Sequence, residues 1–417
     1  MGLKLKEITE KKIGFNITNL SDSKRLSEIM LITHDLSLNY NTIRRFFGVV
    51  KSVKASNYTL DTLAIFNGYK SYNDFLIKFG LQFQWKTELL VIDLIHEKRN
   101  KKLLKFINKE IHLKNEFYII FIQIIRELIL IKNYKLLVKI FKLKQTKQIY
   151  FSFDSLILIG MSIGKLLKKI NFEDTEYHKL LLLKNFQDLV ITINVDYSYL
   201  NTYYEQVISL IYKNSKRKDI LEFCKGVLNV KMYLENKKKE NFYTLIYDDN
   251  FHPILKSRIC SQHILKDKKN IINILEDYFN LNKQEDKIAL EYLFEIIFTS
   301  IITKNFRVMG WIIKKVNYEK KFDQFFELEH YQNFIFMKLL YHRKNNDSLS
   351  IDKILKYFTF NGFNRSYKGV INQYVYILKH HTNNFNKENN YLDLYLKNSK
   401  KMNLPLFTKK HLLTYFD

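Results

Sequence analysis

The chain has 417 residues, of which 47% are hydrophobic and 15% aromatic, so it can bury a large core and is not disordered throughout. It contains only 2 Pro and 11 Gly, whereas all-β folds need turn residues about every 8–12 positions and doubly wound folds need glycine-rich phosphate loops. Composition therefore predicts an all-α protein. Its formal charge of +26 favours encounters with nucleic acid or another anionic surface.

Residues 1–85 contain short helical patterns separated by polar, turn-prone stretches. The first helix begins at Ser21 or Asp22, either of which can cap it. Its apolar positions are Leu26, Ile29, Met30 and Ile32. Three further helices are predicted over residues 39–47, 59–66 and 71–79, and Gly48 ends the first of these three.

The helix over residues 39–47 carries the side chains best suited to nucleic acid. Its apolar residues lie on one face and leave amide and basic side chains on the other. Asn can pair with adenine and Arg with guanine in the major groove, and Lys on the following loop can meet phosphates. The candidate DNA-binding residues are Asn39, Tyr40, Asn41, Thr42, Arg44, Arg45, Lys51 and Lys54. No acidic residue occurs between Asn41 and Tyr58.

This stretch resembles the helix-turn-helix of the Cro/repressor class, in which a recognition helix ends at a Gly and two further helices follow. By alignment on Ile43, Thr33 takes the place of the small residue in the first helix of the pair, and Ser37 that of the Gly in the turn. The resemblance covers about 60 of the 417 residues. It implies duplex DNA binding by residues 20–80.

The same stretch also resembles an N-terminal region of many uncharacterised bacterial proteins. That region carries Ser-x-x-Thr-Leu-x-Arg-x-Phe-Gly, then Thr-Leu-Asp-x-Leu-Ala, then Gly-Tyr-x-Ser-Tyr/Trp-x-Asp-Phe. The matching residues are Asn39 (where Ser is usual), Thr42, Ile43, Arg45, Phe47, Gly48, Thr59, Leu60, Asp61, Leu63, Ala64, Gly68, Tyr69, Ser71, Tyr72, Asp74 and Phe75.

Residues 86–417 consist of long apolar-periodic runs, each followed by a Lys/Asn-rich break and a shorter helix. The predicted pairs are 88–96 with 101–108, 116–131 with 133–141, 203–212 with 217–224, 255–265 with 269–279, and 289–298 with 305–313. Periods of about 33–47 residues are those of helical-hairpin repeats, which stack to bury a continuous core. We therefore expect a small helix-turn-helix-like bundle (1–85) followed by an irregular, solenoid-like array of degenerate tetratricopeptide-like hairpins (86–417). A helical bundle without true repeats stays open.

No residue set with catalytic or metal-binding spacing stands out, so we expect no enzyme, no cofactor and no metal. Cys224 and Cys260 are too few for a disulfide framework or a zinc site. Gly160-x-x-x-Gly164 is not a phosphate loop, because no Gly-Lys-Ser/Thr follows. It predicts instead the close packing of two helices.

The longest apolar run, residues 117–131, is interrupted by polar and charged side chains, so no membrane span is expected. The first residues lack the apolar core of a signal peptide. Together with the low cysteine content, this favours the cytoplasm. Trp85 and Trp311 lie in apolar sequence and are predicted to be buried.

These features predict a cytoplasmic DNA-binding regulator whose repeats bind a protein or peptide partner or another copy of the chain. The layout resembles that of peptide-sensing regulators with an N-terminal helix-turn-helix. A homodimer is expected, because one short recognition helix grips too little DNA to be specific alone. Two alternatives stay open. One is a helical-repeat interaction scaffold with no nucleic-acid role. The other is a sequence-independent RNA or single-strand binder, because both parts of the chain are about equally basic per residue.

Overall fold

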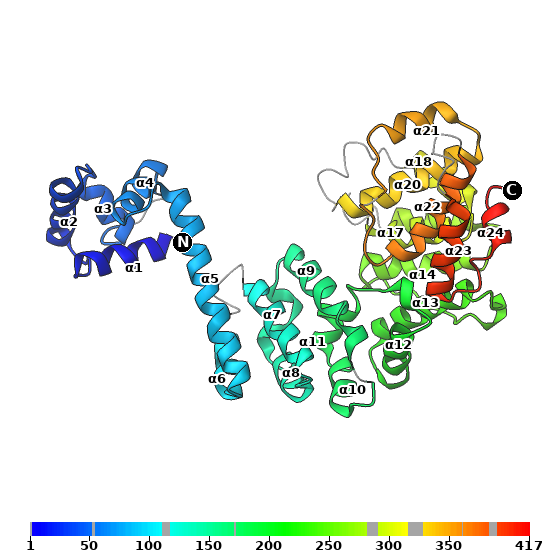
Figure 1. The fold of residues 1–417 in the computed structure, drawn as a ribbon, viewed down its shortest axis with the longest axis horizontal. Coiled ribbons are helices and arrows are strands. Elements are labelled where there is room, and N and C mark those ends of the chain that lie inside the picture. The colour runs from blue at the N-terminus through cyan, green and yellow to red at the C-terminus, as the bar shows by residue number, and fades with distance from the viewer. Residues whose placement is uncertain are drawn as a thin grey trace. The chain divides into compact units, whose positions relative to one another are not determined.

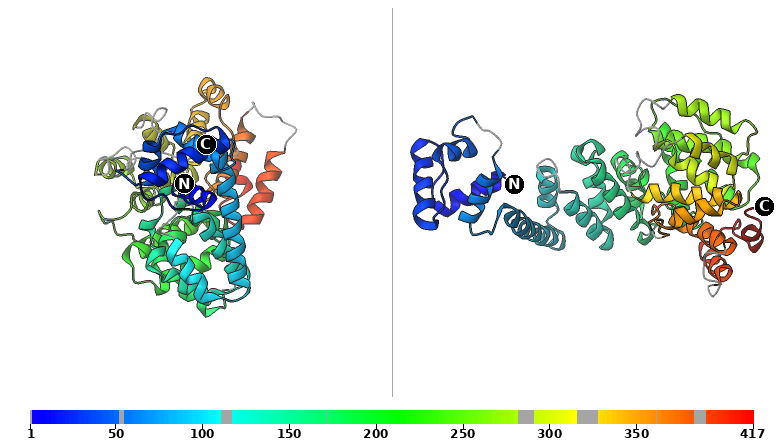
Figure 2. Two further views of the ribbon diagram at one scale, coloured as in Figure 1. Left: turned by 90° about the vertical axis from the view of Figure 1, so that its left-hand side faces the viewer. Right: turned by 90° about the horizontal axis from the view of Figure 1, so that it is seen from above.

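The computed structural model describes residues 2–51, 55–110, 117–170, 172–281, 291–315, 328–360, 362–382 and 390–417. Throughout these ranges the regular secondary structure is helical and no strand occurs, as Figures 1 and 2 show from three directions. The all-α prediction is confirmed. The chain divides into two compact units, Met1–Leu103 and Leu104–Asp417.

The first unit is built from the helices that precede residue 103. They are α1 (Gly2–Ile13), α2 (Leu20–His34), α3 (Tyr40–Phe47), α4 (Asn57–Phe66) and α5 (Tyr72–His96), and α6 (Asn100–Glu110) crosses into the second unit. The boundary that we expected at residue 85 falls inside α5, which runs unbroken to His96. The only glycine of α5 is Gly80, and a single Gly costs a helix interior only about 1 kcal/mol.

Polar side chains cap four of these helices at their N-termini. Asn19 caps α2 and shares a reciprocal capping box with Asp22, so the cap lies before the two residues that we expected. Asn39 caps α3, Ser56 caps α4 and Ser71 caps α5, each by accepting a hydrogen bond from a backbone N–H of the first turn. These caps set where each short helix begins.

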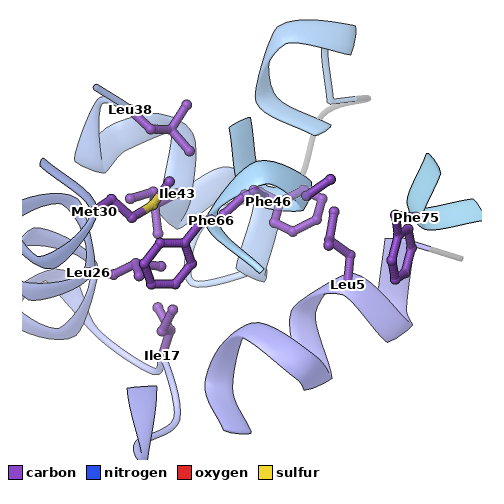
Figure 3. Packing of buried hydrophobic residues seen from close by; sticks show 11 residues of the cluster. Leu5, Ile17, Leu26, Met30, Leu38, Ile43, Phe46, Phe66 and Phe75 are labelled. Atoms are coloured by element: carbon purple, nitrogen blue, oxygen red, sulfur yellow. The ribbon is translucent and has the colours of Figure 1, made fainter. Parts of the chain in front are cut away.

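One apolar core holds the first unit together, and side chains from α1 to α5 converge on it (Figure 3). Its buried members are Leu5, Ile17, Leu26, Met30, Leu38, Ile43, Phe46, Leu63, Ala64, Phe66 and Phe75. Ile32, which we predicted for this core, is 82% exposed. It lies about 200° around the helix axis from Met30, so one helix face cannot bury both.

The second unit consists largely of helices that pack in consecutive pairs. The pairs are α7 (Phe117–Leu130) with α8 (Tyr134–Phe141), α12 (Tyr203–Asn214) with α13 (Lys218–Leu234), α14 (Pro253–Leu265) with α15 (Ile271–Leu281), α17 (Phe294–Ile302) with α18 (Phe306–Lys315), α20 (Leu328–Lys344) with α21 (Ser348–Leu355), and α22 (Lys368–His381) with α23 (Tyr391–Met402). The first four pairs lie where the apolar periodicity predicts them.

Further short helices lie among these pairs. They are α9 (Phe153–Gly164), α10 (Thr175–Leu181), α11 (Lys184–Phe186), which continues as the π-helix η4 (Gln187–Ile191), and α24 (Lys409–Leu413). The unit is therefore an array of helical pairs with irregular insertions.

In four of the pairs, the first helix ends at a left-handed residue that is not glycine. These residues are Lys132, Asp267, Lys304 and Asn346, with φ between 54° and 57°. In each turn, the next N–H bonds back to a carbonyl five residues earlier, as Asn133 does to Leu128 at 2.9 Å. This is the Schellman pattern of helix ends. The Lys/Asn-rich breaks in the sequence are these turns, which explains how a chain poor in glycine builds so many of them.

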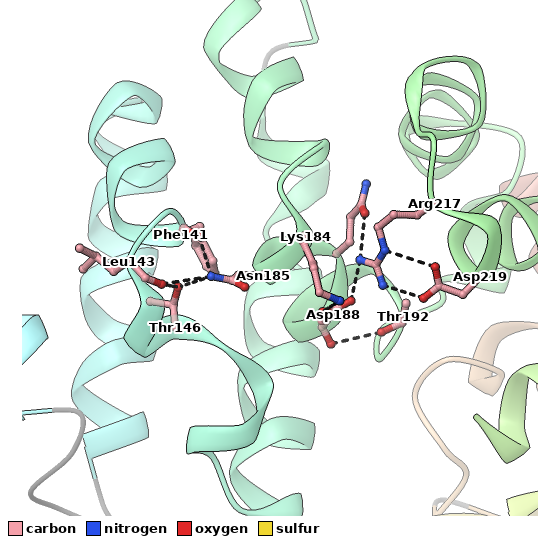
Figure 4. Close-up of polar contacts among 10 residues, drawn as sticks. Phe141, Leu143, Thr146, Lys184, Asn185, Asp188, Thr192, Arg217 and Asp219 are labelled. Atoms are coloured by element: carbon pink, nitrogen blue, oxygen red, sulfur yellow. Dashed lines mark hydrogen bonds and ion pairs between the residues drawn. The ribbon is translucent and has the colours of Figure 1, made fainter. Parts of the chain in front are cut away.

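Side-chain hydrogen bonds and ion pairs also connect neighbouring helical pairs (Figure 4). Asn185 of α11 donates to the carbonyl oxygens of Phe141 and Leu143, at the end of α8, at 2.9 and 3.1 Å. Arg217, directly before α13, lies 2.7 Å from the carboxylate of Asp188 in η4. The Asn185 contacts satisfy carbonyls at the end of α8 that have no partner within that helix, and the Arg217 ion pair joins η4 to the start of α13.

Candidate nucleic-acid interface

The turn between α2 and α3 positions the candidate recognition helix. Asp35 ends α2 in the left-handed conformation (φ 53°), and the N–H of Leu36 donates to the carbonyl of Met30 at 3.2 Å. Asn39 then caps α3 through a hydrogen bond from the N–H of Asn41 at 2.8 Å. Because Ile43 of α3 is fully buried in the same core as Met30, α3 is held against α2 by one face.

A small side chain faces this turn, but it is Ser27 and not Thr33. The hydroxyl of Ser27 donates to the carbonyl of Leu38 at 2.6 Å. Thr33 is exposed, and its hydroxyl donates within its own helix to the carbonyl of Ile29 at 2.6 Å. Thr33, which the resemblance assigns to the close crossing, thus bonds within its own helix, whereas Ser27 connects α2 to the segment before α3.

The candidate residues gather along α3 and its two ends. Asn39 caps the helix, Tyr40, Asn41, Thr42, Arg44 and Arg45 lie on it, and Lys51 follows it. Lys54 lies outside the described residues. Asn39, Asn41, Arg45 and Lys51 are exposed, whereas Tyr40, Thr42 and Arg44 are half-buried. Asn41 and Arg45 lie one turn apart on the same face of α3. We call this face, together with the adjoining Arg44 and the following Lys51, the α3 surface.

The side chains of this surface differ in their freedom to contact a ligand. Arg44 donates to the side-chain oxygen of Asn41 at 3.2 Å, one turn away. Its Nε is buried and has no hydrogen-bond partner among the described residues. Arg45 and Lys51 form no hydrogen bond or ion pair within the described part of the chain. These two cations are therefore available to an anion without the loss of an existing contact.

Two lysines distant in the sequence lie close to α3. The Nζ atom of Lys24, on α2, lies 5.5 Å from the ring centre of Tyr40 at the start of α3. The Nζ of Lys6, on α1, lies 5.3 Å from the ring centre of Phe46 near its end. Sequence analysis missed both, because each occurs in an ordinary charged helix face and only the packing of α1 and α2 brings it to α3.

Other cations of the first unit are engaged inside it. Lys12 donates to the carbonyl of Phe66, and burial lowers the pKa of its ammonium group. The guanidinium of Arg25 lies 4.5 Å from the ring centre of Phe15, within the range of a cation–π contact. Lys12 and Arg25 are therefore less free to meet an anion than Arg45 and Lys51.

The described parts of the second unit hold two thiols but no metal-binding cluster and no helix able to span a membrane. Nowhere in the described ranges do three or more His, Cys, Asp or Glu residues lie where they could hold a metal ion. Cys224 and Cys260 are buried, and burial raises the pKa of each thiol to about 12, which leaves both protonated. None of the described helices has the length and apolar content needed to cross a membrane.

Comparisons with known proteins add no assignment, since no family model, no curated protein and no solved structure matches the chain. The functional argument therefore depends on the residues of the α3 surface.

Proposed function

We propose that the protein is a cytoplasmic DNA-binding regulator without enzymatic activity. In this proposal, α3 enters the major groove of duplex DNA, and the helical pairs of the second unit bind a protein or peptide partner. The observation that carries the proposal is the pair of unengaged cations, Arg45 and Lys51, beside Asn41 on a short, capped and firmly packed helix.

The dimensions of α3 suit a groove. A helix with its side chains is about 10–12 Å in diameter, and the major groove is about 12 Å wide. Asn41 and Arg45 carry the side-chain types that read adenine and guanine by two hydrogen bonds. Lys24 and Lys51 lie near opposite ends of the helix, where they would meet phosphates.

The distribution of charge favours a second candidate, a sequence-independent binder of RNA or single strands. The first unit has 17 Lys and Arg against 10 Asp and Glu, and the rest of the chain is also strongly basic. Bulk charge alone would produce binding that depends steeply on salt and is indifferent to sequence. The two candidates therefore differ in what a substitution on α3 does.

The test is duplex binding by the full chain at roughly 150 mM salt with excess random competitor. Arg45→Ala should weaken binding to selected duplexes by about 1–3 kcal/mol and relax the base preference at one position. Arg45→Lys keeps the charge but loses the bidentate fork, so it should lose most of the preference too. The double variant Arg44→Ala with Arg45→Ala should weaken binding further.

The matched control removes two charges elsewhere, with Lys400→Ala and Lys401→Ala on α23 in the second unit. Loss of these two lysines should lower affinity for all sequences equally and slightly. Equal losses from the control and from the double variant Arg44→Ala with Arg45→Ala would favour the sequence-independent binder. If no nucleic acid binds, the remaining candidate is the helical-repeat interaction scaffold.

A further inference from the structure

Helix α5 carries large apolar side chains on its surface. Ile77, Trp85, Leu89 and Leu90 are 54%, 64%, 44% and 46% exposed. The prediction that Trp85 is buried is wrong, whereas Trp311 is buried as predicted. Ile77, Trp85 and Leu89 are separated by multiples of four residues, so they lie along one ridge of the helix. We call this ridge the α5 stripe.

The start of α5 belongs firmly to the same unit as α3. Phe75 is fully buried in the core of that unit, and the N–H of Tyr72 donates to Asp61 of α4 at 2.7 Å. The stripe is therefore not the edge of a loose segment. Whatever binds it acts on the unit that carries the α3 surface.

Opposite charges flank the stripe at nearly equal distances along the chain from Trp85. Lys78 lies seven residues before it and Asp93 lies eight residues after it. Within the described part of the chain, Lys78 bonds only to Asp74, along its own helix, at 3.0 Å. The carboxylate of Asp93 has no ion pair among the described residues. Both flanking charges remain on the outside of the unit.

This arrangement is complementary to itself in one orientation. If two α5 helices cross antiparallel at Trp85, Lys78 of each copy lies opposite Asp93 of the other, and Lys86 lies beside the second copy's Trp85. A parallel crossing would place like charges together. Self-complementarity of one surface is the requirement of a two-fold interface, and ridges of this kind cross at about −50°.

We propose that the α5 stripe is a homodimer contact in which two copies of the chain cross antiparallel at Trp85. In one respect this rests on the proposed function, because a two-fold dimer presents two α3 helices to two half-sites of one duplex. A single helix crossing is smaller than a standard interface of roughly 1,200–2,000 Å². The dimer should therefore be weak in free solution and strengthened when both copies are held on one duplex.

The first measurement is sedimentation equilibrium of the full chain without DNA. Concentrations from about 1 to 100 μM cover the range in which a weak dimer dissociates. Acrylamide quenching of tryptophan fluorescence reports on the same step, because Trp85 is exposed and Trp311 is 8% exposed. We expect a monomer–dimer equilibrium and quenching that falls as the dimer forms. Trp85→Gln should leave a monomer.

Charge reversal tests the orientation. Lys78→Glu should weaken the dimer by about tenfold, because each interface then holds two like-charge pairs. Adding Asp93→Lys should restore it. The control Lys101→Glu changes an exposed lysine outside α5 and should leave the equilibrium unchanged.

Three results would overturn the proposal. They are a chain that stays monomeric at 100 μM, a dimer that survives Trp85→Gln, and a double charge reversal that fails to restore the contact. Since dimerisation is measured without DNA, its failure is separate from the failure of Arg45→Ala to alter duplex binding.

Discussion

Arg258 and Glu295 form an ion pair in the interior of the second unit. Their side chains are 3% and 2% exposed. The hydroxyls of Tyr197 and Tyr367 donate to the same carboxylate at 2.7 and 3.1 Å. Burial raises the pKa of both phenols well above its usual value, so they remain protonated donors. The guanidinium also lies 4.6 Å from the ring centre of Phe223.

The carboxylate of Glu295 thereby connects four segments of the chain. Arg258 lies on α14 and Glu295 on α17, whereas Tyr197 lies in a short 3-10 turn and Tyr367 directly precedes α22. Burial, the largest single influence, lowers the pKa of Arg258, but the charge and hydrogen bond of Glu295 together with the two tyrosines raise that pKa overall. Each group is therefore the other's counter-charge in the interior.

Removing one partner should be far worse than neutralising both. Arg258→Met leaves a buried carboxylate unpaired and should lower the free energy of unfolding by about 3–5 kcal/mol. Adding Glu295→Gln should recover most of this loss, because a neutral amide still accepts from Tyr197. Urea denaturation measures both variants.

The control for this pair is Lys218→Met, which breaks the exposed pair with Asp248 at 2.9 Å. An exposed pair contributes about 0–1 kcal/mol, so little should change. A double variant as unstable as Arg258→Met alone would contradict the expected coupling.

Single residues also show how far the sequence predicts the candidate site. The outward placement of Asn41 and Arg45 follows from the 3.6-residue period of α3, because Ile43 and Phe46 must face the core. The contributions of Lys24 and Lys6 do not follow, since they depend on how α1 and α2 pack. The buried ion pair of Glu295 could not be predicted either. Glu295 occurs in an apolar run, and its partner, Arg258, lies on another helix.

At the scale of elements, apolar periodicity predicts the helical pairs well, because most helices of the array need one buried face. The turns between them depend on Lys, Asp and Asn in the left-handed conformation, so the scarcity of glycine does not prevent hairpins. Periodicity predicts irregular elements poorly. The π-helix η4 is defined by backbone hydrogen bonds between residues five apart, as from Thr192 to Gln187. No residue type marks this spacing in the sequence.

The close packing of α9 against η4 confirms the prediction that Gly160-x-x-x-Gly164 lets two helices approach closely. A Cβ on Gly160 would lie 2.5 Å from Cγ2 of Ile193 and 2.9 Å from the carbonyl oxygen of Leu189, and one on Gly164 would overlap Asn194. The obstruction at Gly160 includes backbone, which cannot rotate away as a long side chain does.

Gly160→Ala should therefore destabilise the chain despite the better helix propensity of Ala. Overpacking costs about 1–3 kcal/mol, and Ala returns about 1 kcal/mol in a helix interior. The balance is a net loss of about 0–2 kcal/mol. Because both neighbours lie within 3 Å, we expect the upper end of that range in urea denaturation. Ser162→Ala on the same helix is the control and should change stability by about 0.5 kcal/mol or less. A stabilising effect of Gly160→Ala would show that α9 can move away from η4.

At the scale of the whole molecule, the unfolding of each unit can be followed separately, by cysteine labelling in the second unit and by a core substitution in the first. Cys224 and Cys260, the only cysteines, are both fully buried in the second unit. The core of the first unit includes Ile43, which is fully buried. The sequence indicated two parts but placed their boundary too early, because a change in composition at residue 85 does not interrupt a helix whose backbone hydrogen bonds continue to His96.

Because contacts cluster within Met1–Leu103 and within Leu104–Asp417, the two units should unfold in separate transitions. Circular dichroism against urea should show both, whereas labelling of the thiols at pH 8 should follow only the second unit. In the native state, burial and a thiol pKa of about 12 keep both cysteines unreactive.

Two core substitutions distinguish the transitions. Ile43→Ala should shift only the unlabelled transition, by about 2–5 kcal/mol, and Arg258→Met should shift only the labelled one. The first unit is the smaller, so its transition should also have the lower dependence on urea concentration. A single transition that moves with both substitutions and coincides with labelling would mean that the two units fold as one cooperative body.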